Sequence, residues 1–329
     1  MLEKWLKEHQ NYTAVTTFFI LGFPNTRKIE ISLFFLFLIM YLLTVLGNIT
    51  IVITVKTDSH LQTPMYFFLG NLSLMDIGYV SSTVPKLLSI LLTNRHAISF
   101  AGCLLQSYCF FFLGSSECFL LAVMAYDRYV AICYPLRYST IMSKRVCVLL
   151  VMGCWAGGCL SPLVAAIVVI NLPFCGPNVI NHFFCDLPPL LRLACIDTSL
   201  TQKIVFLLSA MVILSTFLST VVSYIYISIT ILKIPSSHGR HKAFSTCASH
   251  LTVVSLYYGT VIFMYVSPTT RSSFNMNKII AVVYSIVTPM LNPMIYSLRN
   301  QDMKTALKKI ILKMNVIRKK LETSKDLYL

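Results

Sequence analysis

Charged side chains are scarce in this chain, and acidic ones are scarcer still. Only 12% of the 329 residues are charged, with 12 Asp and Glu against 27 Lys and Arg, and the mean hydropathy is +0.73. Soluble domains carry about 25% charged residues, so this composition excludes an ordinary soluble protein. The sequence also lacks metal-ligand spacing, a phosphate-binding loop and a nucleophile motif. Neither an enzyme nor a resident cofactor is therefore expected.

Long apolar segments make up most of the sequence. A helix needs about 20 mostly apolar residues to cross a bilayer, because every backbone amide must find its partner inside the segment. Seven segments meet this requirement, and their differing sequences exclude a repeat array. We predict an all-α membrane protein, a single seven-transmembrane helix bundle, with spans at residues 31–55, 61–84, 98–125, 146–170, 204–232, 243–267 and 279–298.

The distribution of basic residues predicts the orientation. Lys and Arg concentrate in cytoplasmic segments, and most of them fall on one side if the N-terminus is outside. We expect an extracellular N-terminus (1–28), a bundle (29–298) and a cytoplasmic tail (299–329) in the plasma membrane. The net charge of +15 then gathers at the membrane surface, so nucleic-acid binding is not expected. The leader shows no cleavable signal peptide, and Asn11 begins a glycosylation sequon there.

Four of the 11 cysteines stand apart from the rest. Seven lie within or beside the predicted helices, where a small buried side chain is the ordinary interpretation. Cys103, Cys175, Cys185 and Cys195 would all face the oxidising side, where disulfides persist. Four cysteines allow three pairings, and the residues alone leave the choice open.

Two acidic residues lie inside predicted spans. Asp76 and Glu117 each fall near the middle of a helix, where ionisable groups are costly and mark function. If both face the bundle, they repel each other unless a proton or a cation lies between them. A sodium ion or a shared proton is one hypothesis, and a structural hydrogen-bond network with Asn48 and Asn292 is the other.

Two motifs suggest a conformational switch. Asp127, Arg128 and Tyr129 lie at the inner end of the third span, just past residue 125, where the Arg can pair with the neighbouring carboxylate in one state and leave it in another. In the seventh span, Pro293 removes a backbone hydrogen bond and is expected to break the helix. The segment from Asn292 to Tyr296 would then serve as a pivot.

With these residues in place, the chain resembles the rhodopsin-like G-protein-coupled receptors, and among them the odorant (olfactory) receptors of the tetrapod type (class II). The resemblance covers almost the whole length. The segments that carry it are Gly47 with Asn48, LQTPMYFFL at 61–69, MAYDRYVAICYP at 124–135, Ser223 with Tyr224, KAFSTCASHL at 242–251 and PMLNPMIYSLRN at 289–300. Departures are Gln62, a minor change, and the lack of any Cys after Cys247, which leaves no palmitoyl anchor.

The resemblance implies disulfides from Cys103 to Cys185 and from Cys175 to Cys195, and a ligand in the outer half of the bundle. Helical spacing places the candidate ligand residues on facing stripes. Ordinary helix packing is the alternative for each of them. The candidates are Phe110, Phe111, Gly114, Ser115, Cys118, Ser209, Val212, Tyr258, Ile262, Tyr265 and Ser285.

None of these candidates is charged, so the expected ligand is a small, neutral, mostly apolar volatile. An amine or an acid would require a buried charged partner. The resemblance further implies that Arg128 leaves Asp127 on activation and is joined by Tyr224 and Tyr296. The partner would be a stimulatory, olfactory-type heterotrimeric G protein that raises cyclic AMP.

The tail is expected to form an amphipathic helix on the inner leaflet. Its apolar residues are Met303, Leu307, Ile310 and Ile311, and Lys304, Lys308 and Lys309 lie beside them.

Two other classes of membrane protein agree less well with these residues. In a transporter or channel, Asp76 and Glu117 would form part of an ion pathway, but the two halves of the chain show no internal repeat. A receptor for a peptide or an amine is disfavoured because the outer part of the third span lacks an acidic residue. Tyr257, Tyr258 and Gly259 in the sixth span also match the odorant pattern.

Overall fold

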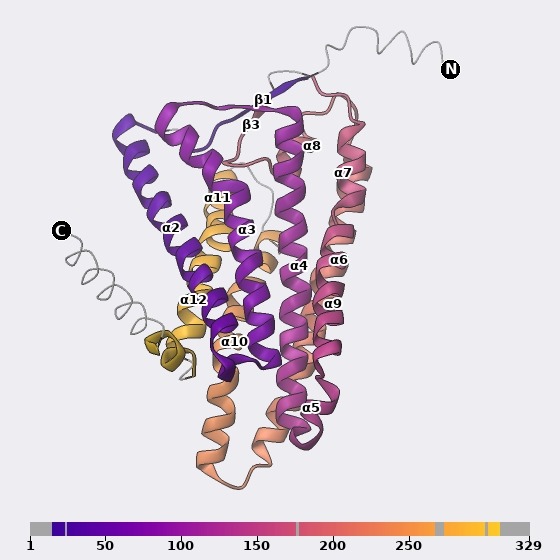
Figure 1. Cartoon of the computed structure of the whole chain (residues 1–329). Helices are drawn as coiled ribbons and strands as arrows, with labels where there is room; N and C mark the ends of the chain where they lie inside the picture. The colour runs from indigo at the N-terminus through magenta and orange to yellow at the C-terminus, as the bar shows by residue number, and fades with distance from the viewer. Residues whose placement is uncertain (1–14, 24, 176–177, 267–272, 300–301, 310–329) are drawn as a thin grey trace, which may run out of the picture.

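The computed structural model describes residues 15–23, 25–175, 178–266, 273–299 and 302–309. They form a bundle of long, roughly parallel helical spans (Figure 1). Five spans are single helices, and two contain a break or a change of helix type. In chain order they are α2 (Arg27–Thr57), α3 (Pro64–Thr93), α4 (Phe100–Cys133), α6 (Lys144–Leu160) with α7 (Leu163–Ile170), α9 (Ser199–Leu232), α10 (Ser237–Val266), and α11 (Ser273–Val282) continuing through η3 (Val283–Val287) into α12 (Thr288–Arg299).

Length and composition confirm the predicted fold class. Five of these spans are long and apolar enough to cross a membrane, and α10 carries a shorter apolar stretch, Cys247–Phe263. The remaining span, α3, has 30 residues and includes the buried Asp76. The protein is therefore an all-α, seven-transmembrane bundle.

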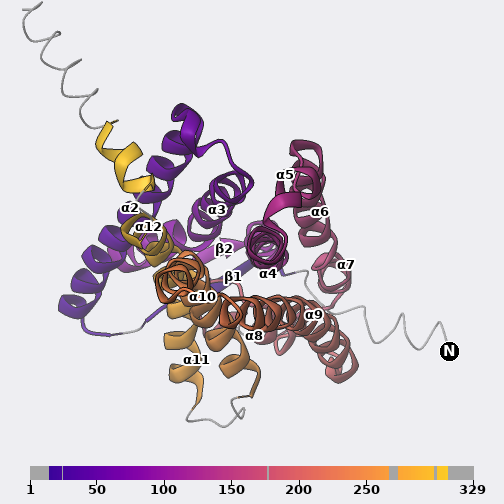
Figure 2. The same cartoon turned by 90° about the horizontal axis from the view of Figure 1, so that it is seen from below.

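Helix α4 runs through the centre of the bundle. Half of its most apolar window is buried, against 11% in α2 and in α9. Seen along the bundle axis, α4 lies amid α3, α6, α9 and α10 (Figure 2). The outer helices expose large apolar side chains such as Leu46 and Leu218, as expected for surfaces that face lipid rather than water.

Several predicted spans have different ends in the structure. Helix α4 continues past residue 125 to Cys133 because nothing interrupts it before Pro135, which begins the short turn η2 (Pro135–Arg137). The fourth span was expected to be continuous, but it is interrupted at Ser161 and Pro162 between α6 and α7. Proline lacks the backbone N–H that an uninterrupted helix requires.

The seventh span corrects one prediction. We expected Pro293 to break this helix, yet α12 runs through it without interruption. The irregular turn is instead the π-helical segment η3, which ends just before Thr288 and Pro289. A wider turn before Pro289 accommodates a residue that cannot donate a backbone hydrogen bond.

A small sheet closes one end of the bundle, which we call the sheet end. Strand β1 (Thr17–Ile20) pairs antiparallel with β2 (Ala97–Ser99) and parallel with β3 (Val179–Ile180). The side chains of Phe18 and Ile20 are completely buried beneath it. The sequence analysis did not predict this sheet, because its strands are short and obtain their partners from distant segments.

The opposite end carries the short helix α5 (Tyr138–Ile141), and we call it the α5 end (Figure 1). Residues 302–309 are also helical there. Met303 and Ala306 are buried, whereas Lys304 and Lys308 are exposed, so the helix is amphipathic as predicted. Lys309 pairs with Asp58 at 3.5 Å. Ile310 and Ile311 lie outside the described residues.

Candidate functional site

The middle of α4 is joined to α10 by two tyrosines. The hydroxyl of Tyr257 donates to the carbonyl oxygen of Gly114 at 2.8 Å and lies 3.3 Å from Sγ of Cys118. The hydroxyl of Tyr258 donates to the carbonyl oxygen of Cys118 at 3.4 Å, and its ring packs against Phe217 of α9. The two helices that were expected to face the ligand are therefore in direct contact.

Gly114 lies between two aromatic side chains. A Cβ atom at this position would be 3.4 Å from the Tyr79 ring and 3.9 Å from the Tyr257 hydroxyl oxygen. These are ordinary van der Waals distances, so the missing side chain leaves space at this point between α3, α4 and α10.

Phe110 lies one turn nearer the sheet end, in an aromatic cluster. Its ring stacks on Tyr79 with centroids 4.6 Å apart and lies 4.4 Å from Phe184 and 6.0 Å from Tyr284. Phe111 meets it edge-on at 5.4 Å. Phe110 therefore faces α3 and the loop before α9, and it shares the α4 face that holds Gly114 and Cys118.

The other ligand candidates are distributed around this region. Val212 and Ile262 pack against the buried cluster that contains Tyr258. Ser115 and Ser209 are partly exposed, and Ser285 is buried with its hydroxyl donating to Ala281. The side chain of Tyr265 lies outside the described residues.

A polar network occupies the centre of the bundle. The side-chain amide of Asn292 donates to both carboxylate oxygens of Asp76, at 3.1 and 3.0 Å. Asn48 donates to the carbonyl oxygens of Thr44 and Pro289. The structure thus contains a hydrogen-bond network around Asp76, which was one of the two alternatives.

Several oxygens in this network have no protein partner. Oε1 of Glu117, Oδ1 of Asn48, Oδ1 of Asn292 and the hydroxyl of Tyr296 are buried without a hydrogen bond among the described residues. Buried polar atoms are normally satisfied, if not by protein then by water or an ion. These oxygens are suited to a hard cation or to bridging water.

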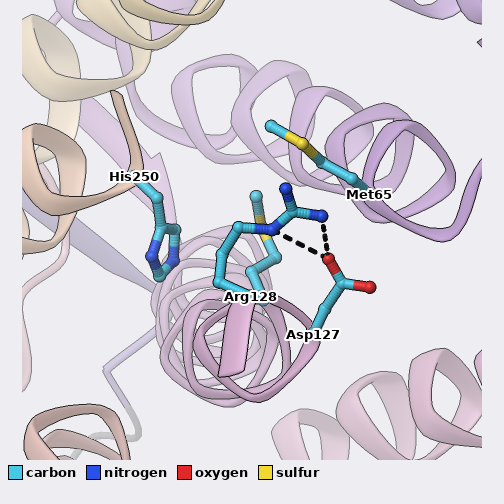
Figure 3. A pocket seen from close by; sticks show the side chains of 5 residues that line it. Met65, Asp127, Arg128 and His250 are labelled. Atoms are coloured by element: carbon cyan, nitrogen blue, oxygen red, sulfur yellow. Dashed lines mark hydrogen bonds and ion pairs between the residues drawn. The ribbon is translucent and has the colours of Figure 1, made fainter. Parts of the chain in front are cut away.

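The Asp127 and Arg128 side chains at the α5 end form an ion pair. Arg128 pairs with Asp127 through its Nε atom at 3.0 Å and through a second guanidinium nitrogen. Both side chains are buried, and the Asp127 carboxylate also accepts a hydrogen bond of 2.7 Å from Tyr138 of α5. Figure 3 shows the Arg128–Asp127 pair beside a small hollow that is also lined by Met65, Met124 and His250.

His250 binds one of the tyrosines that were expected to join Arg128. Its Nδ1 atom lies 2.7 Å from the hydroxyl oxygen of Tyr224, and the two rings are stacked. Tyr296 is buried nearby in the chain's central cluster and has no hydrogen bond to Arg128. The sequence analysis gives His250 no functional role, so its position beside Arg128 was missed.

Two disulfides hold the loop at the sheet end. They join Cys103 to Cys185 and Cys175 to Cys195, each with Cα atoms 5.4 Å apart, and these are the pairings that the resemblance implies. Asn11, the expected glycosylation site, lies outside the described residues.

The same loop carries two buried ionisable groups. Burial raises the pKa of Asp186 to about 6, and burial together with the charge of Lys278 lowers the pKa of His182 to about 3. His182 and Asp186 lie 4.0 Å apart. The sequence analysis singled out neither residue, because nothing in the sequence marked that part of the loop as buried.

Comparison with known proteins identifies the family. The family model described as olfactory receptor matches residues 37–314. The chain is 48% identical to olfactory receptor 6N1 of Homo sapiens over 307 residues, which is 93% of this chain and 98% of that protein. It is 52% identical to olfactory receptor 11H6 of Homo sapiens over 304 residues, 92% of each chain. It is 47% identical to olfactory receptor 5G9 of Mus musculus over 310 residues, which is 94% of this chain and 99% of that protein.

The family model covers the described helices from residue 37, within α2, to the end of α12, and the matches confirm the resemblance found in the sequence. They agree with the seven-helix bundle. The chain belongs to the olfactory receptor family, and it is a multi-pass membrane receptor of the G-protein-coupled class for odorants, not an enzyme.

Proposed function

We propose that this receptor binds a small, neutral, mostly apolar volatile in the half of the bundle nearer the sheet end. The region around Gly114 supports this proposal, because the nearest side chains there, Tyr79 and Tyr257, are aromatic rings that carry hydroxyl groups rather than charges. Tyr257, Tyr258, Ser115 and Ser209 could each supply a hydrogen bond. A charged ligand without a buried partner would lose several kcal/mol.

The proposed orientation places the sheet end outside the cell and the α5 end in the cytoplasm. Disulfides persist on the oxidising side of the membrane, and both disulfides lie at the sheet end. Basic residues favour the cytoplasmic side. At the α5 end the exposed ones include Arg137, Lys144, Arg145, Lys233, Arg240, Lys304, Lys308 and Lys309.

The proposed partner at the cytoplasmic side is a stimulatory, olfactory-type G protein, through which the receptor raises cyclic AMP. The observation that carries this proposal is the buried Arg128–Asp127 pair beside a hollow at the α5 end. In the proposed active state Arg128 leaves Asp127 and is joined by Tyr224 and Tyr296, with the Asn292–Pro293 segment moving as the cavity opens. The neighbouring Leu136 is 97% exposed and offers an apolar contact to that partner.

We further propose a sodium ion or a shared proton between Asp76 and Glu117. The unpartnered oxygens of Asn48, Asn292 and Glu117 support it, because sodium is bound by oxygen atoms and a proton would relieve the repulsion between the two carboxyl groups. Such an ion would hold α3, α4 and α12 together in the closed state. Titrating sodium against the receptor should then lower its basal activity, and the Glu117→Gln variant should respond less.

The ligand class can be tested with compounds of one chain length. Cells that express the receptor with a stimulatory olfactory-type Gα subunit are exposed to 1-hexanol, hexylamine and hexanoic acid, followed by wider panels of neutral volatiles, amines and acids. We expect cyclic AMP to rise only with neutral compounds and only when that Gα subunit is present. Activation confined to amines or acids would overturn the ligand class, and activation through another Gα class would overturn the coupling.

A further inference from the structure

The peptide Gly22–Phe23, which follows β1, is held by distant parts of the chain. The Nζ atom of Lys278 in α11 donates to the carbonyl oxygen of Gly22 at 2.9 Å. The N–H of Gly22 donates to the carbonyl oxygen of His182, also at 2.9 Å. Gly22 has a φ of +65°, which glycine adopts without steric cost. The backbone turns here so that one carbonyl group faces a buried ammonium group.

The ring of Phe23 is stacked between two other rings. Its centroid lies 5.8 Å from that of Phe37 in α2 and 5.4 Å from that of Phe183, with interplanar angles of 20° and 19°. Nζ of Lys278 lies 6.0 Å from the same centroid. Stacked rings at these separations attract each other, and a cation near a ring face adds to the attraction.

Lys278 has capacity for a further acceptor. Its side chain is buried, with the residue only 4% exposed, and an ammonium group carries three donors. Within the part of the chain that the structure describes, the carbonyl oxygen of Gly22 is its one hydrogen-bond acceptor. A buried cation without that acceptor would be strongly destabilised, so any group that replaces Gly22 must also present an oxygen.

We propose that Lys278, Phe37 and Phe183 form a second binding site, at the outer entrance of the receptor, for small neutral aromatic carbonyl compounds. The Gly22–Phe23 peptide occupies this site as a tethered competitor. A flat ring beside a neutral carbonyl reproduces what the peptide offers: the ring enters between Phe37 and Phe183, and the oxygen accepts from Lys278.

The position of this site relates it to the proposed ligand region. Phe183 contacts Phe184 at 5.0 Å, and Phe184 contacts Phe110 at 4.4 Å. An aromatic contact path therefore leads from the entrance to the α4 face that holds Gly114. That role as an entrance rests on the proposed function, whereas binding at Lys278 does not require signalling.

The tether determines what a binding experiment should find. A segment attached by a short linker competes at an effective concentration in the millimolar range, so the intact receptor should bind an external compound weakly. Removing the Phe23 ring increases the fraction of receptor that can bind, and the apparent affinity rises with that fraction.

The test is fluorine NMR on the full-length receptor in lipid nanodiscs, with para-fluoroacetophenone as the probe and para-fluoroethylbenzene, which has the same carbon skeleton without the oxygen, as the comparison compound. We expect Phe23→Ala to bind para-fluoroacetophenone roughly tenfold more tightly than the unmodified receptor. The double variant Phe23→Ala with Lys278→Met should lose this gain. The affinity for para-fluoroethylbenzene should change far less in either variant.

Phe19→Ala is the matched control, because Phe19 belongs to the same N-terminal segment but is 45% exposed and lies outside the stack. It should leave both affinities unchanged. Phe23→Leu keeps an apolar side chain and serves if Phe23→Ala does not fold; it should also increase binding. Equal affinities in the unmodified receptor and the Phe23 variants, or an equal gain for both probes, would overturn the inference. Because this readout needs no G protein, it can fail while an odorant response persists, and the reverse is also possible.

Discussion

Tyr138 of α5 donates a hydrogen bond of 2.7 Å to Asp127, the carboxylate that is also paired with Arg128. Burial and the neighbouring Asp127 both raise the pKa of the Tyr138 hydroxyl, so it remains a donor at neutral pH. The loop at the α5 end therefore supports the Arg128–Asp127 pair directly, and in the proposed mechanism it stabilises the inactive state.

Replacing Tyr138 with Phe should raise the basal activity. The variant removes one hydrogen bond to Asp127 from the proposed inactive state. If that bond stabilises the inactive state by about 1 kcal/mol, its loss makes the active population roughly fivefold larger. Agonist-independent cyclic AMP, divided by surface receptor, measures this. Tyr134→Phe is the control, since among the described residues the one hydrogen bond of the Tyr134 hydroxyl is the 3.4 Å contact that it accepts from Tyr129. Basal activity at or below that of the unmodified receptor would contradict this role of the Tyr138 hydrogen bond.

Much of this switch could be anticipated from the sequence, but its second partner could not. The adjacent Asp127 and Arg128 are recognisable because neighbours in sequence must be neighbours in space. Tyr138 lies beyond Pro135, and its contact with Asp127 depends on how the chain turns through η2 into α5. Local patterns carry little information on such a turn.

The same distinction applies to the fold. The spans were predictable because each satisfies its own backbone and presents a long apolar run. The sheet of β1, β2 and β3 was not, since its strands of two to four residues come from three distant segments. Pro293 was recognised as unusual, yet the irregular turn lies earlier in the span, at Val283–Val287, and no single residue marks that position in the sequence.

Filling the space at Gly114 should weaken ligand binding without unfolding the receptor. In Gly114→Ala the new methyl group meets the Tyr79 ring at 3.4 Å and the Tyr257 hydroxyl at 3.9 Å, which requires little rearrangement. It occupies space that the proposed ligand needs. We expect the half-maximal agonist concentration to rise by about tenfold or more, at unchanged surface expression. An unchanged dose–response curve would place the ligand elsewhere.

Two glycines of α6 provide a matched pair for helix packing. At Gly158 a Cβ would lie 2.8 Å from the backbone nitrogen of Ser116, whereas at Gly153 nothing lies within 4 Å. Small residues allow membrane helices to approach closely, so Gly158→Ala must push α6 away from α4. We expect a severe loss of surface expression for Gly158→Ala and none for Gly153→Ala, measured by cell-surface labelling. Equal expression of the two variants would show that this close approach does not matter.

Asp186 should make the stability of the outer loop depend on pH. Its pKa of about 6 lies above the ordinary value of about 3.9, so its stabilising contribution is complete below about pH 4 and is lost as the pH rises through 6. Asp186→Asn removes that dependence, while its oxygen can still accept the bond from the Leu187 N–H. Two pKa units correspond to at most about 3 kcal/mol.

We therefore expect Asp186→Asn to have a higher melting temperature than the unmodified receptor at pH 7.5. The difference in melting temperature should be smaller at pH 5. Thermal unfolding of the purified receptor at both values measures the difference. His182 affects the stability of the receptor in the opposite direction. Because its pKa is lowered, its stabilising contribution is lost as the pH falls below about 6.5. Both proteins retain His182, so the comparison isolates the effect of Asp186 together with that of its contact with His182. An advantage that is constant with pH would show that Asp186 does not titrate in this range.

The central claim, that this receptor turns neutral volatiles into a G-protein signal through Arg128, is tested most directly by agonist-evoked cyclic AMP in the unmodified receptor and in Arg128→Ala at matched surface expression. The account predicts a response to a neutral volatile in the unmodified receptor and its loss in the variant. A full response that persists in Arg128→Ala would contradict it.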